Sequence, residues 1–271
     1  MIVIEDAHDP RLADYRELKE NRLREDSGKF IAESETVVRQ LLASGLFVES
    51  ILVTAPRLRS LAAVSGREAL RPDIPVYLVP QAVMDDVAGL HVHRGCLAVG
   101  RRPRGPGQAL EAGLLVALED LVDVDNVGAI VRHAAAFGAQ GVLLSPRAAD
   151  PYYRKAIRVA MGNTFKVPIR RLTTWPDDLL ALKQSAGARL VGTVVEPEGA
   201  KVLAGYAPHE ASIVVFGAEG PGLSPALRAA CDDLLTIPMG AADSLNVATA
   251  AAICLYHFTQ VAPQRDRRRA P

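Results

Sequence analysis

The sequence predicts an α/β protein in two parts: a smaller α/β domain, followed by a larger domain built on a parallel sheet. Strand-like and helix-like segments alternate along almost the whole chain, as in sheets whose strands are joined by helices. The strand-like segments of the second half are nearly continuous apolar runs, which is typical of parallel strands covered on both faces. Between the halves, residues 101–107 read Arg-Arg-Pro-Arg-Gly-Pro-Gly and interrupt every periodic pattern.

The first hundred residues are expected to form the smaller domain. Helical periodicity extends over residues 36–43, and short apolar runs predict strands at 30–31, 49–53, 74–79 and 96–99. Residues 11–29 have a helix-like pattern in which basic and acidic side chains are interleaved. Such a stretch is either a solvated helix with i,i+4 ion pairs or a face that meets phosphates, and the pattern leaves both interpretations open.

The Pro- and Gly-rich stretch predicts an interdomain linker at residues 101–112. The larger domain then covers residues 113–262, and an arginine-rich tail follows at 263–271. Apolar runs predict strands of the larger domain at 114–118, 141–144, 189–195, 212–216 and 234–237. Helical patterns predict helices at 127–137 and 245–260.

Composition limits the class of protein. Apolar residues make up 49% of the 271, enough for a packed core, and no apolar run reaches the roughly 18–20 residues of a membrane helix. The amino terminus lacks a signal-peptide pattern and the three cysteines are scattered, so a cytoplasmic protein without disulfides is expected. The formal net charge of zero weakens a nucleic-acid interpretation, although total charge does not show its distribution.

Three segments carry the candidate chemistry, and the first spans residues 118–132. It reads Leu-Glu-Asp-Leu-Val-Asp-Val-Asp-Asn-Val-Gly-Ala-Ile-Val-Arg: a strand end, an acidic turn and the start of a helix. Asn126 is expected to be the N-cap of that helix. Arg132 has apolar neighbours, so the helix is expected to be largely buried and Arg132 to need a carboxylate, a phosphate or an open cleft.

The second segment, residues 216–225, reads Phe-Gly-Ala-Glu-Gly-Pro-Gly-Leu-Ser-Pro after a buried strand. Glycines at the carboxyl end of a parallel strand let the backbone approach a ligand closely. Their order differs from the dinucleotide fingerprint, and no Gly-Lys-Ser/Thr follows, so a P-loop is excluded. Glu219 would repel a pyrophosphate, which favours a neutral or cationic ligand.

The third segment, residues 237–250, reads Ile-Pro-Met-Gly-Ala-Ala-Asp-Ser-Leu-Asn-Val-Ala-Thr-Ala. A strand ends, a loop of small residues follows, and an apolar helix is expected to begin with Ser244 as its N-cap. Asn246 is a poor helix former in the first turn, so it either bonds to the local turn or contacts a ligand.

Together the three segments resemble the motifs of the SpoU (TrmH-type) RNA ribose methyltransferases, within the SPOUT superfamily. The similarity lies in Asn-Val-Gly-Ala-Ile-Val-Arg at 126–132, Phe-Gly-Ala-Glu-Gly-Pro-Gly-Leu-Ser at 216–224 and Ile-Pro-Met-Gly-x-x-x-Ser-Leu-Asn-Val-Ala at 237–248. Residues 158–165 resemble the family's R-x-S-x-G-A-x-F, with Ala160 and Asn163 in place of serine and alanine. Residues 28–33 are similar to part of an L30e-like RNA-binding domain, with Ser34 where the family often has glycine.

The resemblance implies a larger domain whose carboxyl-terminal segment is threaded as a trefoil knot, an exception to ordinary chain topology. It implies S-adenosylmethionine (AdoMet) as cofactor and a homodimer that completes the active site. The residues that match family positions for catalysis or substrate placement are Asn126, Arg132, Glu219, Ser244 and Asn246. The residues expected around AdoMet are Thr193, Gly217, Gly220, Ile237, Met239 and Leu245. The residues expected to contact RNA are Arg24, Lys29 and Arg158.

The reaction that the resemblance implies is methylation of a ribose 2′-hydroxyl. Ribosomal RNA is favoured over transfer RNA because the amino-terminal domain is large. In this family, proton removal is most often assigned to the arginine that matches Arg132. A guanidinium, however, stays protonated in proteins. We therefore expect Arg132 to hold a phosphate, with that phosphate or a water accepting the proton.

The sequence disfavours three other interpretations. His91, His93 and Cys96 have a zinc-like spacing, but three ligands without a second half-site favour a structural turn, so no metal is expected. A catalytically silent RNA-binding protein of the same fold is disfavoured because the polar motif residues are intact. An NAD-dependent Rossmann enzyme is disfavoured by the glycine order.

Overall fold

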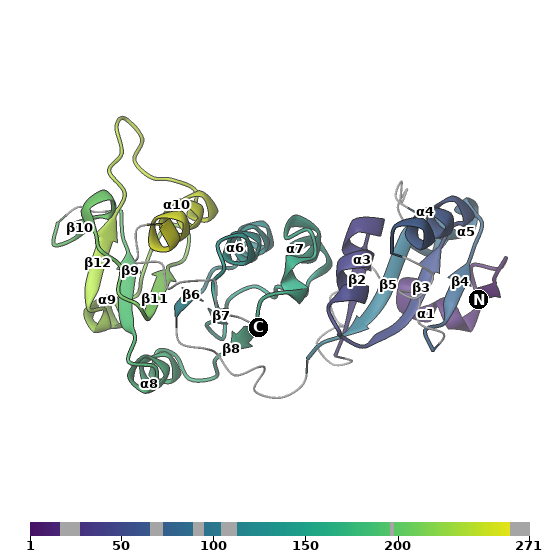
Figure 1. Ribbon diagram of the computed structural model, residues 1–271, viewed down its shortest axis with the longest axis horizontal. Coiled ribbons are helices and arrows are strands. Elements are labelled where there is room, and N and C mark those ends of the chain that lie inside the picture. The colour runs from purple at the N-terminus through teal and green to yellow at the C-terminus, as the bar shows by residue number, and fades with distance from the viewer. Residues whose placement is uncertain (17–27, 66–72, 89–94, 104–112, 196–197, 261–271) are drawn as a thin grey trace, which may run out of the picture. The chain divides into compact units, whose positions relative to one another are not determined.

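The computed structural model describes residues 1–16, 28–65, 73–88, 95–103, 113–195 and 198–260. The chain forms two compact units (Figure 1): the first contains Met1–Gly105 and Tyr152–Lys166, and the second contains Pro106–Pro151 and Val167–Pro271. The range 113–262, expected to be one domain, contributes to both units, because residues 152–166 group with the first. Most of the expected linker, the arginine-rich tail, Arg24, His91 and His93 lie outside the described residues.

The first unit is built on a mixed five-stranded sheet in the order β1-β4-β3-β5-β2. Its strands are β1 (Ile2–Val3), β2 (Lys29–Glu33), β3 (Val48–Val53), β4 (Val76–Leu78) and β5 (Cys96–Arg101). The pairs β1–β4 and β3–β4 are parallel, whereas β5 is antiparallel to both β2 and β3. Alternate residues of each strand point to opposite faces, so both faces of this sheet need a covering layer.

Helices cover both faces of this sheet. Their bounds are η1 (Pro10–Leu12), α1 (Ala13–Arg16), α3 (Glu35–Ala43), α4 (Ala55–Ser65), α5 (Gln81–Ala88), α7 (Arg154–Val159) and η3 (Asn163–Phe165). One apolar core joins the sheet to α3, α4 and α7, and the other joins it to η1, α1 and α5. Of the helix-like stretch 11–29, residues 11–16 lie in η1 and α1, residues 17–27 are outside the described residues, and Lys29 begins β2, so the expected helix does not extend to residue 29.

Residues 152–166 pack into the first of these cores. Ile157 and Phe165 are buried there, and the Phe165 ring stacks on Phe30 with centroids 5.2 Å apart. Arg154 forms an ion pair with Glu33, with Nε 3.4 Å from Oε2. A segment that follows β7 of the second unit in sequence is therefore part of the hydrophobic core of the first unit.

The second unit contains a seven-stranded, entirely parallel sheet in the order β10-β12-β9-β11-β6-β7-β8. Its strands are β6 (Leu114–Leu118), β7 (Gly141–Leu144), β8 (Ile169–Arg171), β9 (Arg189–Thr193), β10 (Lys201–Val202), β11 (Ser212–Phe216) and β12 (Asp233–Thr236). The five strands predicted for this part of the chain are confirmed, with ends that shift by at most two residues. The predicted α/β class with a parallel sheet is confirmed as well.

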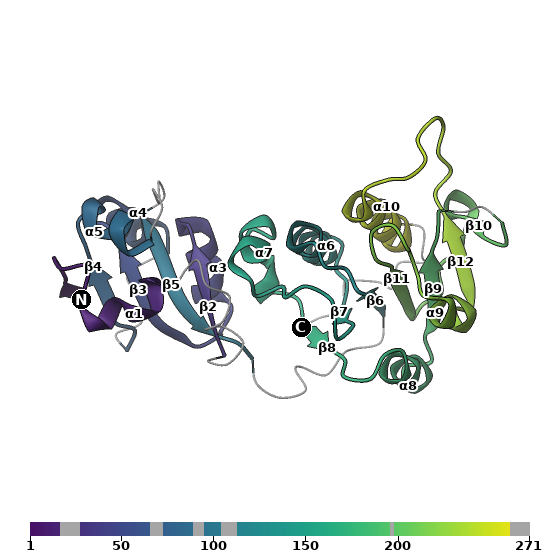
Figure 2. The ribbon, with the colours of Figure 1, turned by 180° about the vertical axis from the view of Figure 1, so that it is seen from behind.

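Helices lie on both sides of the parallel sheet (Figures 1 and 2). Their bounds are α6 (Val124–Ala136), α8 (Asp177–Ser185), η4 (Leu203–Gly205), α9 (Pro225–Ala230) and α10 (Val247–Gln260). Helices α6 and α10 pack against each other on one side, and Leu179 of α8 and Leu227 of α9 enter the core on the other. Within the described ranges, no helix is both long and apolar enough to cross a bilayer.

Candidate functional site

The candidate site lies at the carboxyl edge of the parallel sheet. Because all seven strands run in the same direction, the loops after β6, β11 and β12 leave the sheet at one edge. Ligands of open α/β sheets bind outside this edge. The three segments singled out in the sequence are the continuations of these three strands.

Helix α6 is capped by Asp123, and the prediction that Asn126 is its N-cap is wrong. The Asp123 Oδ1 accepts the backbone N–H of Asp125 at 2.7 Å and that of Asn126 at 3.4 Å. Asp is as good an N-cap as Asn, and Asp123 is the residue that directly precedes the helix. Asn126 therefore lies inside the first turn, and its side chain is released from capping.

The side chain of Asn126, which does not cap the helix, joins the loop after β11 to the loop after β12. Its Nδ2 donates to Glu219 Oε1 at 2.7 Å, and its Oδ1 accepts from Asn246 Nδ2 at 2.9 Å. We call Asn126, Glu219 and Asn246 the polar triad. Three of the five residues expected in catalysis thus form one continuous hydrogen-bonded chain across the loops after β6, β11 and β12.

Asn246 is the N-cap of α10, so the prediction that Ser244 has this role is wrong. The Asn246 Oδ1 accepts the backbone N–H groups of Ala248 at 2.9 Å and Thr249 at 3.2 Å. Because this oxygen is occupied by the helix end, the Nδ2 is the group that faces Asn126. The turn-bonding and ligand-site interpretations of Asn246 are therefore compatible, since the cap orients the amide toward the triad.

The triad has a defined chemical polarity. Donation runs from Asn246 to Asn126 and from Asn126 to Glu219, so both amides have a fixed orientation. Each amide keeps a second N–H, and Glu219 keeps its second carboxylate oxygen. The arrangement presents two N–H donors and a carboxylate acceptor, with Glu219 and Asn246 exposed and Asn126 half-buried, which suits binding and orienting a hydroxyl group.

Arg132 does not reach the triad within one chain. It lies about 9 Å further along α6 than Asn126, at a rise of about 1.5 Å per residue, and on a different side of the helix. Arg132 is exposed, and no carboxylate partner among the described residues meets it, so of the three expected surroundings a phosphate or an open cleft is left. Neither Arg132 nor Ser244, which is also exposed, forms a hydrogen bond or an ion pair with another residue that the structure describes.

The glycine-rich loop after β11 is shaped by contact with itself. Ala218 and Gly222 exchange two backbone hydrogen bonds, of 3.1 and 2.9 Å, which close the loop. A Cβ at Gly217 would overlap the backbone of Gly222 and Leu223. From the sequence, these glycines are expected to let the backbone approach a ligand closely. At position 217 this explanation is incomplete, because the loop's own backbone already requires glycine there.

The other residues expected around AdoMet lie at the end of β9, in the loop after β12 and in the glycine-rich loop itself. The Thr193 hydroxyl donates to the Val215 carbonyl at 2.9 Å and so links the ends of β9 and β11. Ile237 and Met239 are half-buried, whereas Leu245 is 37% exposed. A Cβ at Gly220 would meet no atom within 4 Å, but its φ of +88° favours glycine.

Sequence reasoning missed Glu119, which follows the last residue of β6 and is 3% exposed. It accepts hydrogen bonds from Trp175 and from both the backbone and the hydroxyl of Ser224. A carboxylate directly after a wholly apolar strand is the signal that could have identified it, because a buried carboxylate needs partners. Its neighbour Asp120 bonds to Ser145 and Arg147, and the Arg147 bond, despite opposing burial, lowers the pKa of Asp120.

Two of the three expected RNA contacts lie in the first unit, and the third, Arg24, is not among the described residues. Lys29 forms ion pairs with Asp14 and Glu49, both at 2.8 Å. Burial alone would lower the pKa of Lys29, but these two carboxylates outweigh it and raise the pKa. Arg158, on α7, is exposed.

Among the described residues, no group of three or more His, Cys, Asp or Glu side chains could hold a metal ion, and Cys96 is a buried free thiol.

Comparison with known proteins places these features in context. Residues 113–256 match the model of the SpoU rRNA Methylase family. The chain is 38% identical over 266 residues to an uncharacterized tRNA/rRNA methyltransferase of Mycobacterium bovis, a similarity that covers 94% of this chain and 90% of the relative.

Solved structures resemble the whole fold. The AdoMet-bound rRNA methyltransferase from Sinorhizobium meliloti is similar with a TM-score of 0.79 and 27% identity, over 94% of this chain and 97% of that one. A structure described as an RNA 2′-O ribose methyltransferase is similar with a TM-score of 0.75 and 26% identity, over 94% and 97% of the two chains.

Proposed function

The chain belongs to the SpoU rRNA Methylase family, and on that premise we propose that it methylates a ribose 2′-hydroxyl of structured RNA, with AdoMet as methyl donor. The observation that carries this proposal is the polar triad at the carboxyl edge of the parallel sheet. The relatives support the rest, because one similar structure is described as an RNA 2′-O ribose methyltransferase and another contains AdoMet.

The residues at the edge of the sheet fit AdoMet. Ile237, Met239 and Leu245 offer apolar contacts for an adenine ring, and the backbone at Gly220 is unobstructed by other atoms. Gly217 and Thr193 lie at the ends of adjacent strands, where backbone groups would bond to the adenosyl group. AdoMet supplies an electrophilic methyl group on a sulfonium cation, and the carboxylate of Glu219 is compatible with a cation where it would repel a phosphate.

The triad would position the attacking hydroxyl. Methyl transfer is an in-line displacement: the O–C bond forms as the C–S bond breaks, so the nucleophile must be held on the axis of the leaving sulfur. Holding reacting groups in this way is worth roughly 7–11 kcal/mol. Asn126 and Asn246 would donate their second N–H groups to the ribose, and Glu219 would hold Asn126 in the required orientation.

Arg132 would bind the phosphate next to the target nucleotide. A guanidinium is permanently charged and matches phosphate geometry, so it clamps the backbone without serving as a base. The 2′-hydroxyl proton would leave to that phosphate or to a water as the new bond forms. Ser244, exposed near the start of α10, would contact the same backbone.

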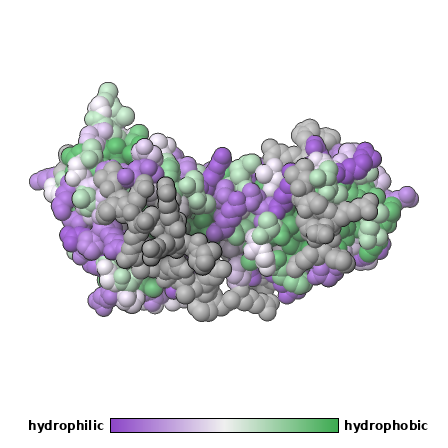
Figure 3. Space-filling model, viewed as in Figure 1, coloured by the Kyte–Doolittle hydropathy of each residue, from purple (hydrophilic) through white to green (hydrophobic). Residues whose placement is uncertain are grey.

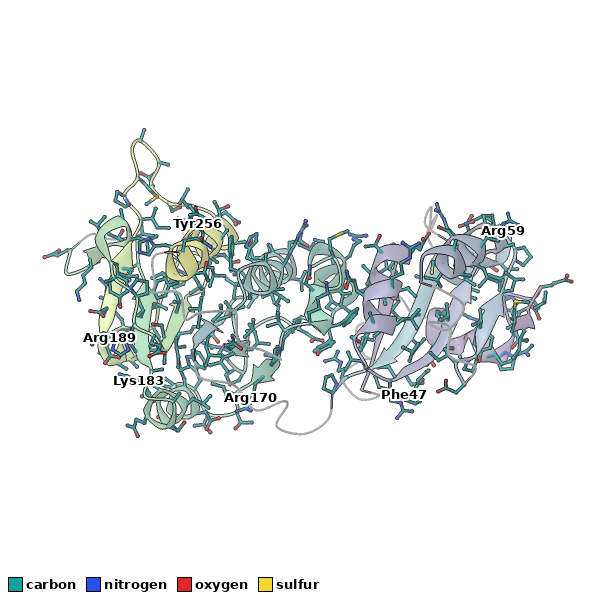
Figure 4. The ribbon with its side chains drawn as sticks, in the orientation of Figure 1. Phe47, Arg59, Arg170, Lys183, Arg189 and Tyr256 are labelled. Carbon is teal, nitrogen blue, oxygen red and sulfur yellow. The ribbon has the colours of Figure 1, made fainter. Side chains whose placement is uncertain are left out.

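A second copy of the chain would bring Arg132 to the triad, which one chain alone does not. The loop between β12 and α10 projects from the second unit (Figure 1), and its residues 240–246 are all exposed. This loop is largely apolar on the face shown in Figure 3. On α10, Tyr256 is 58% and Ile253 38% exposed, and Figure 4 labels Tyr256 there. Such apolar exposure favours a homodimer, which light scattering would measure directly. The trefoil knot that the resemblance implies stays a prediction.

The first unit would select the RNA, and we favour ribosomal RNA because this unit is an additional compact domain. Its exposed Arg158 is the described residue that we propose for phosphate contact. Lys29 is engaged with two carboxylates, so its contribution would require those pairs to exchange.

The test is methyl transfer by the purified protein. We expect label from tritiated AdoMet to enter ribosomal RNA at a single 2′-O-methyl site, and that site to be unmethylated in cells without the protein. Label in transfer RNA alone would redirect the substrate assignment. AdoMet binding without label in any RNA fraction would identify a silent RNA-binding member of the family.

A further inference from the structure

Glu119 lies where β6 meets the glycine-rich loop. Its backbone N–H bonds to the carbonyl of Phe216 at 2.9 Å, in continuation of the β6–β11 ladder. The residue is 3% exposed, although a carboxylate is strongly hydrated in water. Burying such a group is unfavourable unless it is fully hydrogen-bonded.

Three neutral donors satisfy this carboxylate. Trp175 Nε1 donates to Oε1 at 2.8 Å, the Ser224 hydroxyl donates to Oε1 at 2.7 Å, and the Ser224 backbone N–H donates to Oε2 at 2.8 Å. Ser224 also caps α9, since its Oγ accepts from Leu227 N at 3.3 Å. Glu119 therefore joins the end of β6, the end of the glycine-rich loop and the loop before α8.

The glycine-rich loop is thus anchored at Glu219 and at Ser224, on both sides of Gly220. Asn126 holds Glu219, and Glu119 holds Ser224. Gly220 and Gly222, between these anchors, have φ values of +88° and +70° and lack side chains that could fix the backbone. A glycine-rich segment loses much conformational entropy when it is ordered, so anchors that order it beforehand strengthen ligand binding.

From this arrangement we infer that Glu119 is a positioning residue for the methyl-donor site: it holds residues 217–224 in the conformation that binds AdoMet. The inference rests on the proposed function, because it takes the loop to be the AdoMet site. Glu119 acts through Ser224 and makes no contact with substrate. Its removal should therefore weaken AdoMet binding and loosen the loop before any chemistry occurs.

Glu119→Gln is the informative substitution because it preserves the shape of the side chain and replaces one acceptor oxygen with an NH₂ donor. The carboxylate accepts an N–H on each oxygen, from Trp175 and from Ser224. In the variant, an NH₂ group must face one of these two donors. Trp175→Phe removes the indole donor, so in the double variant the amide oxygen can accept from Ser224 N while the NH₂ group donates to Ser224 Oγ.

The matched control is Asp233→Asn. Asp233 is another buried, hydrogen-bonded carboxylate, 7% exposed, but it begins β12 and so lies at the amino edge of the same sheet. Replacing the Asp233 carboxylate should lower the free energy of unfolding without changing the AdoMet site. We would measure AdoMet affinity by calorimetry for the four proteins, and hydrogen exchange of residues 217–224 in the absence of ligand.

We expect Glu119→Gln to raise the Kd for AdoMet about tenfold or more and to speed exchange in the loop, because a buried donor is left unsatisfied. Glu119→Gln/Trp175→Phe should recover most of the affinity, and Asp233→Asn should stay within about twofold of the wild type. If Glu119→Gln does not fold, Trp175→Phe alone should still raise the Kd several-fold.

Wild-type affinity in Glu119→Gln would overturn the inference, and so would an equal loss of affinity in Asp233→Asn. An absence of AdoMet binding by the wild-type protein would instead overturn the proposed function. In that case the exchange measurement on the ligand-free proteins still decides whether Glu119 orders the loop, since unchanged exchange in Glu119→Gln contradicts it.

Discussion

Asn126 and Asn246 hydrogen-bond through their side-chain amides at 2.9 Å, one from the first turn of α6 and the other from the cap of α10. The Asn246 oxygen is used by the end of α10, and the Asn126 Nδ2 is used by Glu219. The direction of each bond is therefore fixed by its neighbour. A change at any member of this chain should disturb the position of the other two.

Asn126→Asp should reduce methyl transfer about 100-fold, the scale of a small misplacement of reacting groups. The aspartate can still accept from Asn246, but it cannot donate to Glu219 and places a second negative charge beside it. The measurement is kcat/KM with tritiated AdoMet. Gln140→Glu is the control, because it makes the same amide-to-acid change at a loop residue whose side-chain bond is local, from Nε2 to the Gly138 carbonyl at 3.4 Å. Asn126→Asp activity within twofold of the wild type would contradict a role for the triad.

Arg132→Lys should leave the Kd for AdoMet unchanged and lower methylation sharply, because lysine cannot make the paired phosphate contact of a guanidinium. Calorimetry and the transfer assay on the same preparation separate the two effects. Methylation at the wild-type rate would exclude the phosphate-clamp role.

Mixed dimers test whether Arg132 acts across subunits. An Arg132→Lys chain and an Asn126→Asp chain would be co-expressed with different tags, and the heterodimer would be isolated by both tags. If each site takes Arg132 from one chain and the triad from the other, one of the two sites is intact and about half of the activity returns. If Arg132 acts on the triad of its own chain, both sites are damaged and the heterodimer is as inactive as the parent variants.

Gly217→Ala should abolish AdoMet binding while the protein stays folded. The added methyl would overlap the backbone of Gly222, so the loop closed by Ala218 and Gly222 would have to open. Gly205→Ala is the control, because Gly205 is the last residue of η4 and a Cβ at this position would meet no atom within 4 Å. Calorimetry should show loss of heat only for Gly217→Ala; retained affinity would show that the loop tolerates rearrangement.

Much of the parallel sheet was predictable because its strands are buried on both faces and read as uninterrupted apolar runs. The ends of helices were less predictable. Around α6, Asp123 and Asn126 are both good caps, and the sequence alone does not show that Asn126 is needed by Glu219. Likewise Ser244 and Asn246 compete for the cap of α10, and only the fold shows which one meets Asn126.

Contacts distant in sequence were the other part that could not be predicted. The packing of Phe165 on Phe30 in the first unit leaves no periodic signal near residue 165. One departure from the family pattern has a structural consequence, since Ser34, where glycine is common, has a φ of +89°. Its hydroxyl accepts from Val37 N at 3.4 Å and caps α3, a bond that glycine could not make.

Asp233 is the centre of a charge cluster at the amino edge of the parallel sheet. It accepts from Arg189 Nε at 2.7 Å, Lys201 Nζ at 2.5 Å and Tyr206 Oη at 3.0 Å, and Figure 4 labels Arg189. The Arg189 bond is the largest of the effects that hold the pKa of Asp233 far below its usual value. Burial, together with the bond to Asp233, raises the pKa of Tyr206 to about 12.

Asp233→Asn should lower the free energy of unfolding at pH 7 by about 1–3 kcal/mol, because it weakens hydrogen bonds to a buried charge. A carboxylate whose folded pKa lies below its unfolded value of about 3.9 stabilises the fold above that value, and this stabilisation is lost as the pH falls toward the folded pKa. The difference between wild type and variant should therefore be full at pH 7 and 5 and shrink below pH 4. Urea unfolding at pH 7, 5, 4 and 3 measures it, with exposed Glu198→Gln as a control expected within about 0.5 kcal/mol of the wild type. A difference that is constant from pH 7 to pH 3 would show that the contribution of Asp233 comes from packing, because packing does not titrate.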